Sequence, residues 1–301
     1  MRTSMRGQRR GRGIAASLAL VLVLVFALSY AAGRLGLFRG GGLPLSQPKI
    51  GVILIQGVLA DSRPVIEELE RYKEREDVKA LVFRIDSPGG TVVAAQEVYA
   101  EIRKLRGQKI TLSSLGNVAA SGGYYVASAT EEILANPGTV TGSIGVISEY
   151  ANVEELLRKI GLRSTVLKAG RFKDAGSPFR EMTPEEEAYM QSLLDSIHKQ
   201  FIRDVAQGRR KTPDEIEPYS DGRVFTGEQA HEIGLVDRLG DFQDALDRAA
   251  ELAGIEGKPV ILYPEEEKLR FLDYLIGSFE GYLRDMLLRV LQPSSPGCVV
   301  Q

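Results

Sequence analysis

The sequence predicts an α/β fold, built from buried strands that alternate with helices and preceded by one apolar N-terminal segment. Short apolar runs bounded by turn residues predict the strands, and stretches of helical periodicity lie between them. The chain has 301 residues, of which 44% are hydrophobic and 26% charged, so it can bury a sizeable core.

Strands and helices are expected to alternate through the body of the chain. The expected strands lie at residues 49–59, 80–85, 110–115, 132–135, 164–167 and 260–263. The expected helices lie at residues 65–75, 92–105, 121–129, 153–160, 183–207 and 241–252. The long helix has the clearest start, because Thr183 can cap it, Pro184 suits its first turn, and glutamates follow at its positive end.

The N-terminus has the pattern of a transmembrane signal anchor. Residues 14–32 form an apolar run that as a helix would span about 28 Å, close to the thickness of a bilayer core. Five arginines precede this run, so the positive-inside rule keeps residues 1–13 in the cytoplasm and exports the rest. A cleaved signal peptide is the alternative, because residues 29–31 form a passable small-residue cleavage site.

The remaining boundaries follow from composition. Residues 33–48 contain glycines and prolines and are expected to be a linker, and residues 49–264 form the body. Residues 265–301 are expected to form an amphipathic helix followed by a tail. The apolar stripe of that helix would pack on its own domain or on another subunit; contact with the membrane surface is the alternative.

Charge and cysteine content exclude several classes of protein. Residues 1–40 hold seven arginines and no acidic residue, so the remainder carries 31 basic against 40 acidic side chains, a net charge of −9. An acidic body without a basic stripe argues against nucleic-acid binding. Because Cys298 is the only cysteine, neither an intrachain disulfide nor a cysteine-based zinc site can form, and we expect no metal or other cofactor.

The candidate nucleophile is Ser121, in the stretch Ala-Ala-Ser-Gly-Gly-Tyr-Tyr at residues 119–125. A strand is expected before it and a helix after it, so its hydroxyl and the Gly122 N–H would face the same spot at a helix N-terminus. The alternative is a small-residue helix that packs against a neighbour. The Gly-x-Ser-x-Gly elbow of other hydrolases is absent, because position 119 is alanine.

A second glycine-containing turn could assist the same chemistry. Asp-Ser-Pro-Gly-Gly at residues 86–90 ends an expected strand and precedes an expected helix. Glycine lets backbone N–H groups approach a ligand closely, so this loop can supply one oxyanion donor. An ordinary strand-to-helix turn is the alternative interpretation.

A histidine base is disfavoured by the sequence. The order Ser121, Asp221, His231 can be drawn as a triad, but His231 falls in an apparently exposed short helix. The only other histidine, His198, lies in the long helix among polar residues. Both histidines are therefore expected at the surface.

A lysine base must be neutral to accept the serine proton, and burial without a close carboxylate lowers the pKa of a lysine. Lys168 and Lys173 are both candidates. Asp174 follows Lys173 directly, which counts against that lysine unless the carboxylate points away. Ser143 offers a hydroxyl that could hold the amine in place, although an ordinary turn would also explain that motif.

Taken together, five motifs between residues 49 and 262 resemble the signal peptide peptidase A family, in its short bacterial form. They occur in order and with compatible spacing, which makes the resemblance specific although each motif alone is weak. The motifs lie at residues 86–90, 119–125, 141–145, 168–174 and 225–237.

The resemblance implies a fold of the ClpP/crotonase type, a β-β-α spiral. It implies Ser121 as the nucleophile, Lys173 as the general base and Ser143 as the hydrogen-bond partner that orients this lysine. Gly89 and Gly122 would supply the N–H groups of the oxyanion hole.

The expected protein is therefore a serine endopeptidase anchored in the bacterial cell membrane, with its catalytic body outside the cytoplasm. It would cut released signal peptides and other membrane-associated peptides through an acyl-enzyme. Long members of the family carry two copies of the fold and this chain carries one, so the resemblance also implies a homo-oligomeric ring.

Three alternatives remain open from sequence alone. The chain could be an inactive membrane scaffold of the same fold, although intact Ser121 and Lys173 speak against this. It could be a general quality-control protease for membrane proteins. An acyl-CoA enzyme of the crotonase type is disfavoured by export and by a nucleophilic serine that such an enzyme does not need.

Overall fold

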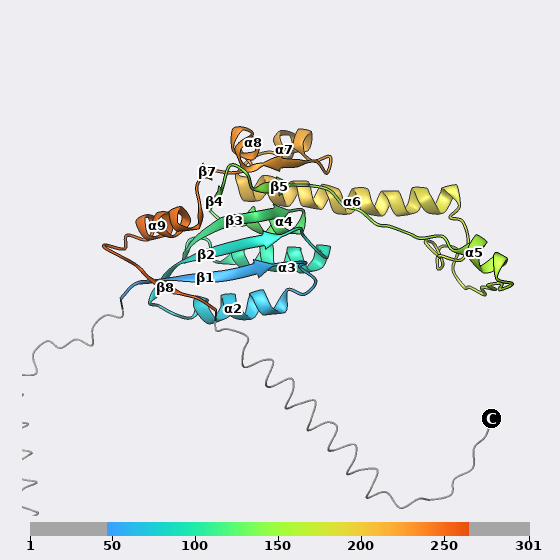
Figure 1. Ribbon diagram of the computed structural model, residues 1–301, viewed down its shortest axis with the longest axis horizontal. Helices are drawn as coiled ribbons and strands as arrows, with labels where there is room; N and C mark the ends of the chain where they lie inside the picture. Colours follow the sequence, from blue (N-terminus) through green and yellow to red (C-terminus); the bar gives the residue numbers. More distant parts are fainter. Residues whose placement is uncertain (1–46, 265–301) are drawn as a thin grey trace, which may run out of the picture. The chain divides into compact units, whose positions relative to one another are not determined.

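The computed structural model describes residues 47–264, which form one sheet with helices on both of its faces (Figure 1). The segments predicted at residues 1–13, 14–32 and 265–301, and nearly all of the linker, lie outside the described residues. Within the described range, no helix combines the length and the apolarity needed to cross a bilayer. The predicted α/β class is confirmed.

The sheet is parallel except where β5 pairs with β6. Its strands follow the order β6-β5-β3-β2-β1-β8, and β4 pairs with both β3 and β7. The central strands are nearly continuous apolar runs, as expected where both faces of a parallel sheet are covered. The strands are β1 (Lys49–Gln56), β2 (Val78–Ser87), β3 (Ile110–Ala120), β4 (Glu132–Ala135), β5 (Val140–Gly142), β6 (Val224–Thr226), β7 (Arg238–Leu239) and β8 (Val260–Leu262).

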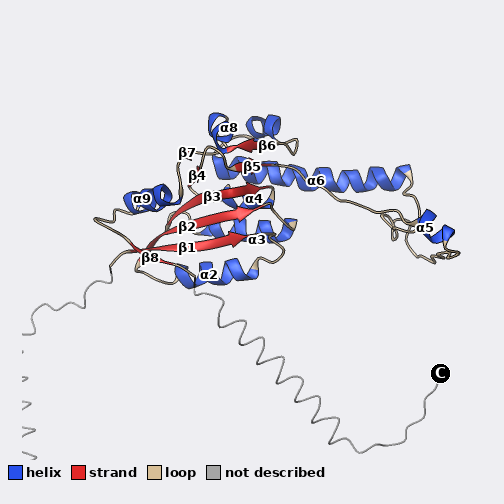
Figure 2. Cartoon of the chain, in the orientation of Figure 1, coloured by secondary structure: helices blue, strands red, loops and turns tan. Residues whose placement is uncertain are grey.

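The helices lie on either side of this sheet and at its β5–β6 edge (Figure 2). They are α2 (Arg63–Lys73), α3 (Val92–Lys104), α4 (Gly122–Ala127), α5 (Glu154–Lys159), α6 (Pro184–Arg209), α7 (Pro213–Ile216), α8 (Gly227–Glu232) and α9 (Phe242–Leu252). A short 3₁₀ helix, η1 (Glu217–Tyr219), follows α7.

Each face of the sheet buries its own hydrophobic core. On β2, Phe83 and Ile85 pack into the core covered by α2, α3 and α4, whereas Ala80 and Val82 pack into the core covered by α9. This alternation follows from the two-residue period of a strand. Ala119 near the end of β3 belongs to the first core, so the turn that follows β3 starts from a packed strand.

The start of α6 is fixed by the residues that the sequence singles out. The Glu186 N–H donates to the Thr183 hydroxyl at 3.3 Å, and the Thr183 N–H donates to the Glu186 carboxylate at 3.0 Å, while Pro184 occupies the first turn. This is a complete capping box, typically worth about 1 kcal/mol of helix stability. The predicted start of the long helix is confirmed.

Residues 146–182, which we name the arm, differ from the rest of the described chain because none of them is buried. The arm contains α5 and joins the N-terminal end of α6, whose first half is also largely exposed (Figure 1). The strand predicted at residues 164–167 is wrong. These four residues are exposed and pair with no strand, because the arm lies off the sheet and offers them no ladder partner.

Most other predicted elements are present within a few residues of their expected ends. Strand β3 is longer than predicted, because it continues from Leu115 through Ala120 and pairs with β4 in its first half and β5 in its second. The strands β5, β6 and β7 were not predicted. With two or three residues each, they are too short for periodicity to reveal.

Candidate active site

Ser121 lies where β3 ends and α4 begins, and its backbone is strained. Its φ is 51° and its ψ is −119°, although a non-glycine residue with positive φ is uncommon. Holding a residue there costs about 1–3 kcal/mol, and such strain collects at functional sites. Only two other non-glycine residues of the described chain share a positive φ, and one of them is Ser143.

Glycine is required beside Ser121 because two backbones meet there. A methyl group added at Gly89 would lie 2.9 Å from the Ser121 Cβ and 2.8 Å from the Gly122 nitrogen, and the φ of Gly89 is 108°. One added at Gly122 would lie 3.3 Å from the Gly89 Cα. The structure therefore brings Ser121, Gly89 and Gly122 together, as the sequence predicts.

The two glycine N–H groups of the 86–90 loop are not equivalent. The Gly89 N–H donates to the hydroxyl of buried Ser87 at 3.2 Å and is therefore already engaged. The Gly90 N–H has no acceptor within the described residues, and its nitrogen faces Gly122. Sequence reasoning named Gly89 as the donor and did not consider Gly90, because the hydrogen bond from Gly89 to Ser87 has no local signal in the sequence.

Backbone hydrogen bonds with Leu59 hold the loop that carries these glycines in place. The Leu59 N–H donates to the Gly89 carbonyl at 2.9 Å, and the Thr91 N–H donates to the Leu59 carbonyl at 2.9 Å. This short parallel bridge holds the peptide between Gly89 and Gly90 in one orientation. The Gly90 N–H is therefore preorganised, which is the property that makes an oxyanion donor effective.

Ser143 lies beside Ser121 across the β3–β5 ladder. Ala120 pairs with Gly142, and the Ser121 N–H donates to the Gly142 carbonyl at 2.9 Å. The Ser143 N–H donates to the Arg223 carbonyl at 2.8 Å, which holds the strained turn at a φ of 52°. Two serines with similar strain thus end adjacent strands.

The helix behind Ser121 is braced by two tyrosines. The Tyr124 hydroxyl donates to the Leu235 carbonyl at 2.8 Å, and the Tyr125 hydroxyl donates to the Asp204 carboxylate of α6. Burial raises the pKa of both phenols, so they stay neutral donors at any working pH. This bracing opposes rotation of α4 away from the strained turn.

The structure separates the two candidate lysines by their partners. Lys168 forms an ion pair with Asp174, whose carboxylate also accepts from Arg180 at 2.9 Å. The Arg180 guanidinium, followed by the Lys168 ammonium, holds the pKa of Asp174 well below its usual range. Lys173 is exposed and forms no ion pair within residues 47–264. The Asp174 carboxylate thus points to other cations, as a free Lys173 amine requires.

Helix α6 separates the arm from the core of the body. At its arm end Tyr189 stacks on Phe172, with ring centroids 4.9 Å apart. At its body end Phe201 packs on Tyr125, with centroids 4.5 Å apart. Twelve residues divide Tyr189 from Phe201, which is about 18 Å along a helix.

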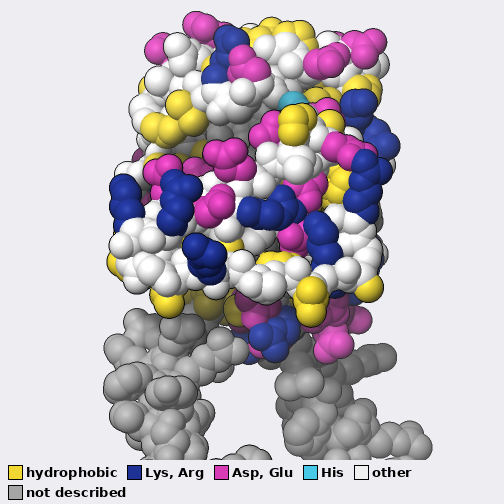
Figure 3. All heavy atoms as spheres, turned by 90° about the vertical axis from the view of Figure 1, so that its right-hand side faces the viewer, with side chains coloured by type: hydrophobic (Ala, Val, Ile, Leu, Met, Phe, Trp, Pro, Cys, Tyr) yellow, Lys and Arg dark blue, Asp and Glu magenta, His cyan; other side chains and the backbone are white. Residues whose placement is uncertain are grey.

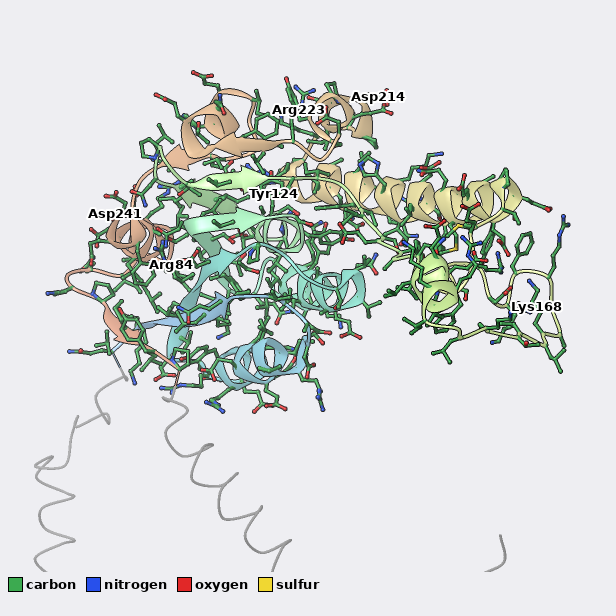
Figure 4. The ribbon with its side chains drawn as sticks, turned by 45° about the vertical axis from the view of Figure 1, so that its right-hand side comes forward. Arg84, Tyr124, Lys168, Asp214, Arg223 and Asp241 are labelled. Carbon is green, nitrogen blue, oxygen red and sulfur yellow. The ribbon has the colours of Figure 1, made fainter. Side chains whose placement is uncertain are left out.

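Ser121 and Lys173 therefore do not meet within one chain. Lys173 adjoins the arm contact, and Ser121 is one helical turn from the body contact. Figure 4 shows Lys168 out on the arm, beyond the exposed end of α6, whereas Tyr124 lies within the body. The lysine that Ser143 is expected to orient is not its neighbour in this chain.

The histidine alternative has no structural support. The His231 Nδ1 atom lies 3.2 Å from the Val236 carbonyl, and Asp221 is paired with Arg223. His231 is exposed, as predicted, whereas His198 is only partly exposed. His198 is half-buried, because its helix packs against the body, and its Nε2 atom is buried without a partner among the described residues.

A serine held at a strained strand-to-helix turn, beside backbone N–H groups with no acceptor, has the geometry of a serine hydrolase. The sequence agrees, because residues 103–256 match peptidase family S49. The chain belongs to this family and is a serine-type peptidase.

Several relatives carry protease names. A Synechocystis sp. relative named as a protease is 42% identical over 234 residues, which cover 77% of this chain and 84% of that protein. An Enterococcus faecium relative named as a signal peptide peptidase, SppA, is 32% identical over 73% of this chain and 68% of its own length. Protease 4 of Salmonella typhi is 38% identical over 74% of this chain but only 36% of its own length. The predicted resemblance to the SppA-type peptidases is confirmed.

Proposed function

We propose that this S49 peptidase is anchored in the bacterial cell membrane and cleaves released signal peptides, and other membrane-associated peptides, through a Ser121/Lys173 dyad. The dyad is supported by the contrast between the surroundings of these two residues and those of the other candidates. Ser121 sits in a strained, preorganised turn, and Lys173 alone among the two candidate lysines lacks a carboxylate partner within the described residues. The succession of parallel strands and helices is compatible with the ClpP/crotonase-type spiral that we also infer.

The chemistry follows from these groups. Neutral Lys173 accepts the proton of the Ser121 hydroxyl as Oγ attacks the scissile carbonyl carbon. The carbonyl oxygen becomes an oxyanion and accepts from backbone N–H groups. The C–N bond then breaks, and the leaving amine takes the proton from Lys173. Water, deprotonated by the same lysine, then attacks the acyl carbon; the ester C–O bond breaks, and the Ser121 Oγ recovers a proton from Lys173.

For the oxyanion hole we propose the N–H groups of Gly122 and Gly90. Gly122 follows the nucleophile, and its N–H is a first-turn donor without an intrahelical partner. The Gly89 N–H, which the sequence favoured, is engaged by Ser87, whereas the Gly90 N–H is free. Gly89 would then serve by its lack of a side chain, since any Cβ there would collide with Ser121.

We propose further that the dyad is completed between subunits of a homo-oligomeric ring. No residue of the arm is buried in its own chain, and the arm exposes many large apolar side chains. They are Ile147, Tyr150, Leu156, Ile160, Leu162, Val166, Leu167 and Phe179.

An exposed apolar set of this extent favours a protein partner. Figure 3, seen from the arm side, shows hydrophobic side chains interspersed with basic and acidic ones. A head-to-tail contact would carry Lys173 of one copy to Ser121 and Ser143 of the next, and repetition of such a contact closes a ring.

The test is subunit complementation with the full-length chain in detergent. Ser121→Ala and Lys173→Ala proteins, each inactive alone, are dissociated, mixed equally and reassembled. If the site is shared, about a quarter of the boundaries hold both intact residues, and a model signal peptide should be cut at up to about a quarter of the wild-type rate. No recovery, despite proven subunit exchange, would place the dyad within one chain or refute it.

A further inference from the structure

The segment around Lys173 is tied to the first turns of α6 by a cluster of four alternating charges. Arg180 lies between two carboxylates: its guanidinium donates to Asp174 at 2.9 Å and to both oxygens of Glu186 at 2.6 and 2.8 Å. Lys168 pairs with the other side of Asp174. Two cations therefore face two anions, and the cluster is close to neutral as a whole.

This cluster has a built geometry and is not an incidental surface pair. Glu186 is buried and also closes the capping box with Thr183, and its hydrogen bonds with Arg180 lower its pKa to about 2. Arg180 also donates to the backbone carbonyls of Asp174 and Glu181, at 3.3 and 2.9 Å. One guanidinium thus fixes both the direction of the Asp174 side chain and the backbone next to Lys173.

The other charged and titratable groups around this segment are also engaged. Arg171 pairs with Glu185 of α6, and the ring of Tyr189 stacks on Phe172. Tyr150 packs beside Gly176. Lys173 is left as the one basic side chain of residues 168–173 without a carboxylate in the described structure.

We propose that Arg180 is a positioning residue, which holds the Asp174 carboxylate away from Lys173 so that the amine can lose its proton. The inference rests on the proposed role of Lys173 as the base. Its physical reason is the adjacency of the two residues: a freed Asp174 would be the nearest anion to the amine. An opposite charge within about 4–6 Å raises the pKa of a lysine by about 1–3.

The consequence is a change in the pH profile and not only in the rate. With Arg180 in place, activity should rise with pH as Lys173 deprotonates. In Arg180→Gln, Asp174 keeps Lys168 as its only partner in the cluster and is free to turn towards the protonated amine of Lys173, so the rising limb of activity should move up by about 1 pH unit or more. A defect of folding alone would lower activity at every pH but would not change the pH at which activity rises.

The experiment uses full-length protein and measures, between pH 6 and 10, the rate at which a fluorophosphonate probe labels Ser121. Four proteins are compared: wild type, Arg180→Gln, Asp174→Asn and the double variant. We expect the upward shift in Arg180→Gln only, and a return to the wild-type limb in the double variant, which has no carboxylate to release. An unshifted limb in Arg180→Gln would overturn the proposal.

Asp174→Asn keeps the proposal testable if Arg180→Gln fails to fold. Its rising limb should stay at the wild-type pH or fall below it; a limb at higher pH would show that Asp174 helps deprotonation, which contradicts the proposal. Lys173→Ala separates this inference from the proposed function. If that variant labels Ser121 as fast as wild type, the dyad itself is wrong, whereas a dead Lys173→Ala with an unshifted Arg180→Gln refutes only the role of Arg180.

Discussion

The body around Ser121 and the arm around Lys173 are built on opposite principles. Every residue of α4 is buried, and the turn before it is held by backbone hydrogen bonds to β5 and by packing of β3. The arm has no buried residue, and ion pairs and one aromatic stack tie it to α6. Ser121 is therefore held in position by contacts within its own chain, whereas Lys173, the proposed base, is exposed to solvent on the arm.

The largest expected effects test whether both regions serve one reaction. Ser121→Ala removes the attacking atom and should lower kcat by at least about 10³-fold. Lys173→Arg should lower it comparably, because arginine does not give up its proton at working pH. Cleavage of a fluorogenic peptide measures both, and Lys168→Arg is the matched control that should stay active. An active Lys173→Arg protein would show that Lys173 is not the general base, and the proposed role of the arm in catalysis would be wrong.

The second test concerns the preorganised glycine loop of the body. In Gly90→Ala the added methyl would overlap the Leu59 carbonyl, so the loop must shift and carry the Gly90 N–H away from the site. Loss of one oxyanion donor typically lowers kcat by about 10²–10³-fold. Gly138→Ala, where a methyl meets nothing within 4 Å, is the control. Normal turnover by Gly90→Ala would exclude this glycine from the oxyanion hole.

The third test sharpens the contrast in how each region is stabilised. Phe83→Ala empties a fully buried position and should lower the free energy of unfolding by about 3–5 kcal/mol. Leu167 is 96% exposed, so Leu167→Ser should leave unfolding within about 0.5 kcal/mol while weakening assembly and activity several-fold. Calorimetry and analytical ultracentrifugation separate the two. A Leu167→Ser protein that assembles and cleaves normally would show that this part of the arm contacts no partner.

The smallest expected effect is the acid sensitivity of the junction between arm and α6. The pKa of Glu186 is lowered from 4.5 to about 2, first by its hydrogen bonds with Arg180 and then by Thr183. A lowered carboxylate pKa stabilises the fold above the unfolded value, and this contribution is lost as pH falls from about 4.5 towards 2. Protection factors for hydrogen exchange at the start of α6, which are corrected for the intrinsic exchange rate at each pH, should therefore fall over this range. Glu186→Gln should flatten that dependence, and an unchanged slope would contradict it.

Sequence predicted the body far better than the arm, for a physical reason. Strands and helices are predicted from the periodicity of apolar residues that face a core, and of the two regions only the body has such a core. At residues 164–167 the residues favour a strand, but a strand exists only if an edge is available to pair with it.

Within the site, the residue types predicted Ser121 and its glycine neighbours, but two choices depended on tertiary contacts. Our preference for Gly90 over Gly89 as a donor depends on the Ser87 hydroxyl, and our preference for Lys173 over Lys168 as the base depends on the cations that pair with Asp174. Neither contact has a local signal in the sequence. The placement of Ser143 beside Ser121 likewise follows from a three-residue strand that no pattern reveals.

The length of helix α6 sets both the distance and the direction of the arm relative to the body. Its body end is fixed by Phe201 and its arm end by Tyr189, so its length sets how far from the sheet the arm is displayed, and its pitch sets the direction. Removing seven residues between these two points would shorten the reach by about 10 Å yet rotate the arm by only about 20°. Removing two would turn it by about 160° and point Lys173 nearly the opposite way. An insertion or deletion in the exposed half of α6 therefore keeps the direction of the arm only where its length is close to a whole number of turns, as seven or eleven residues are.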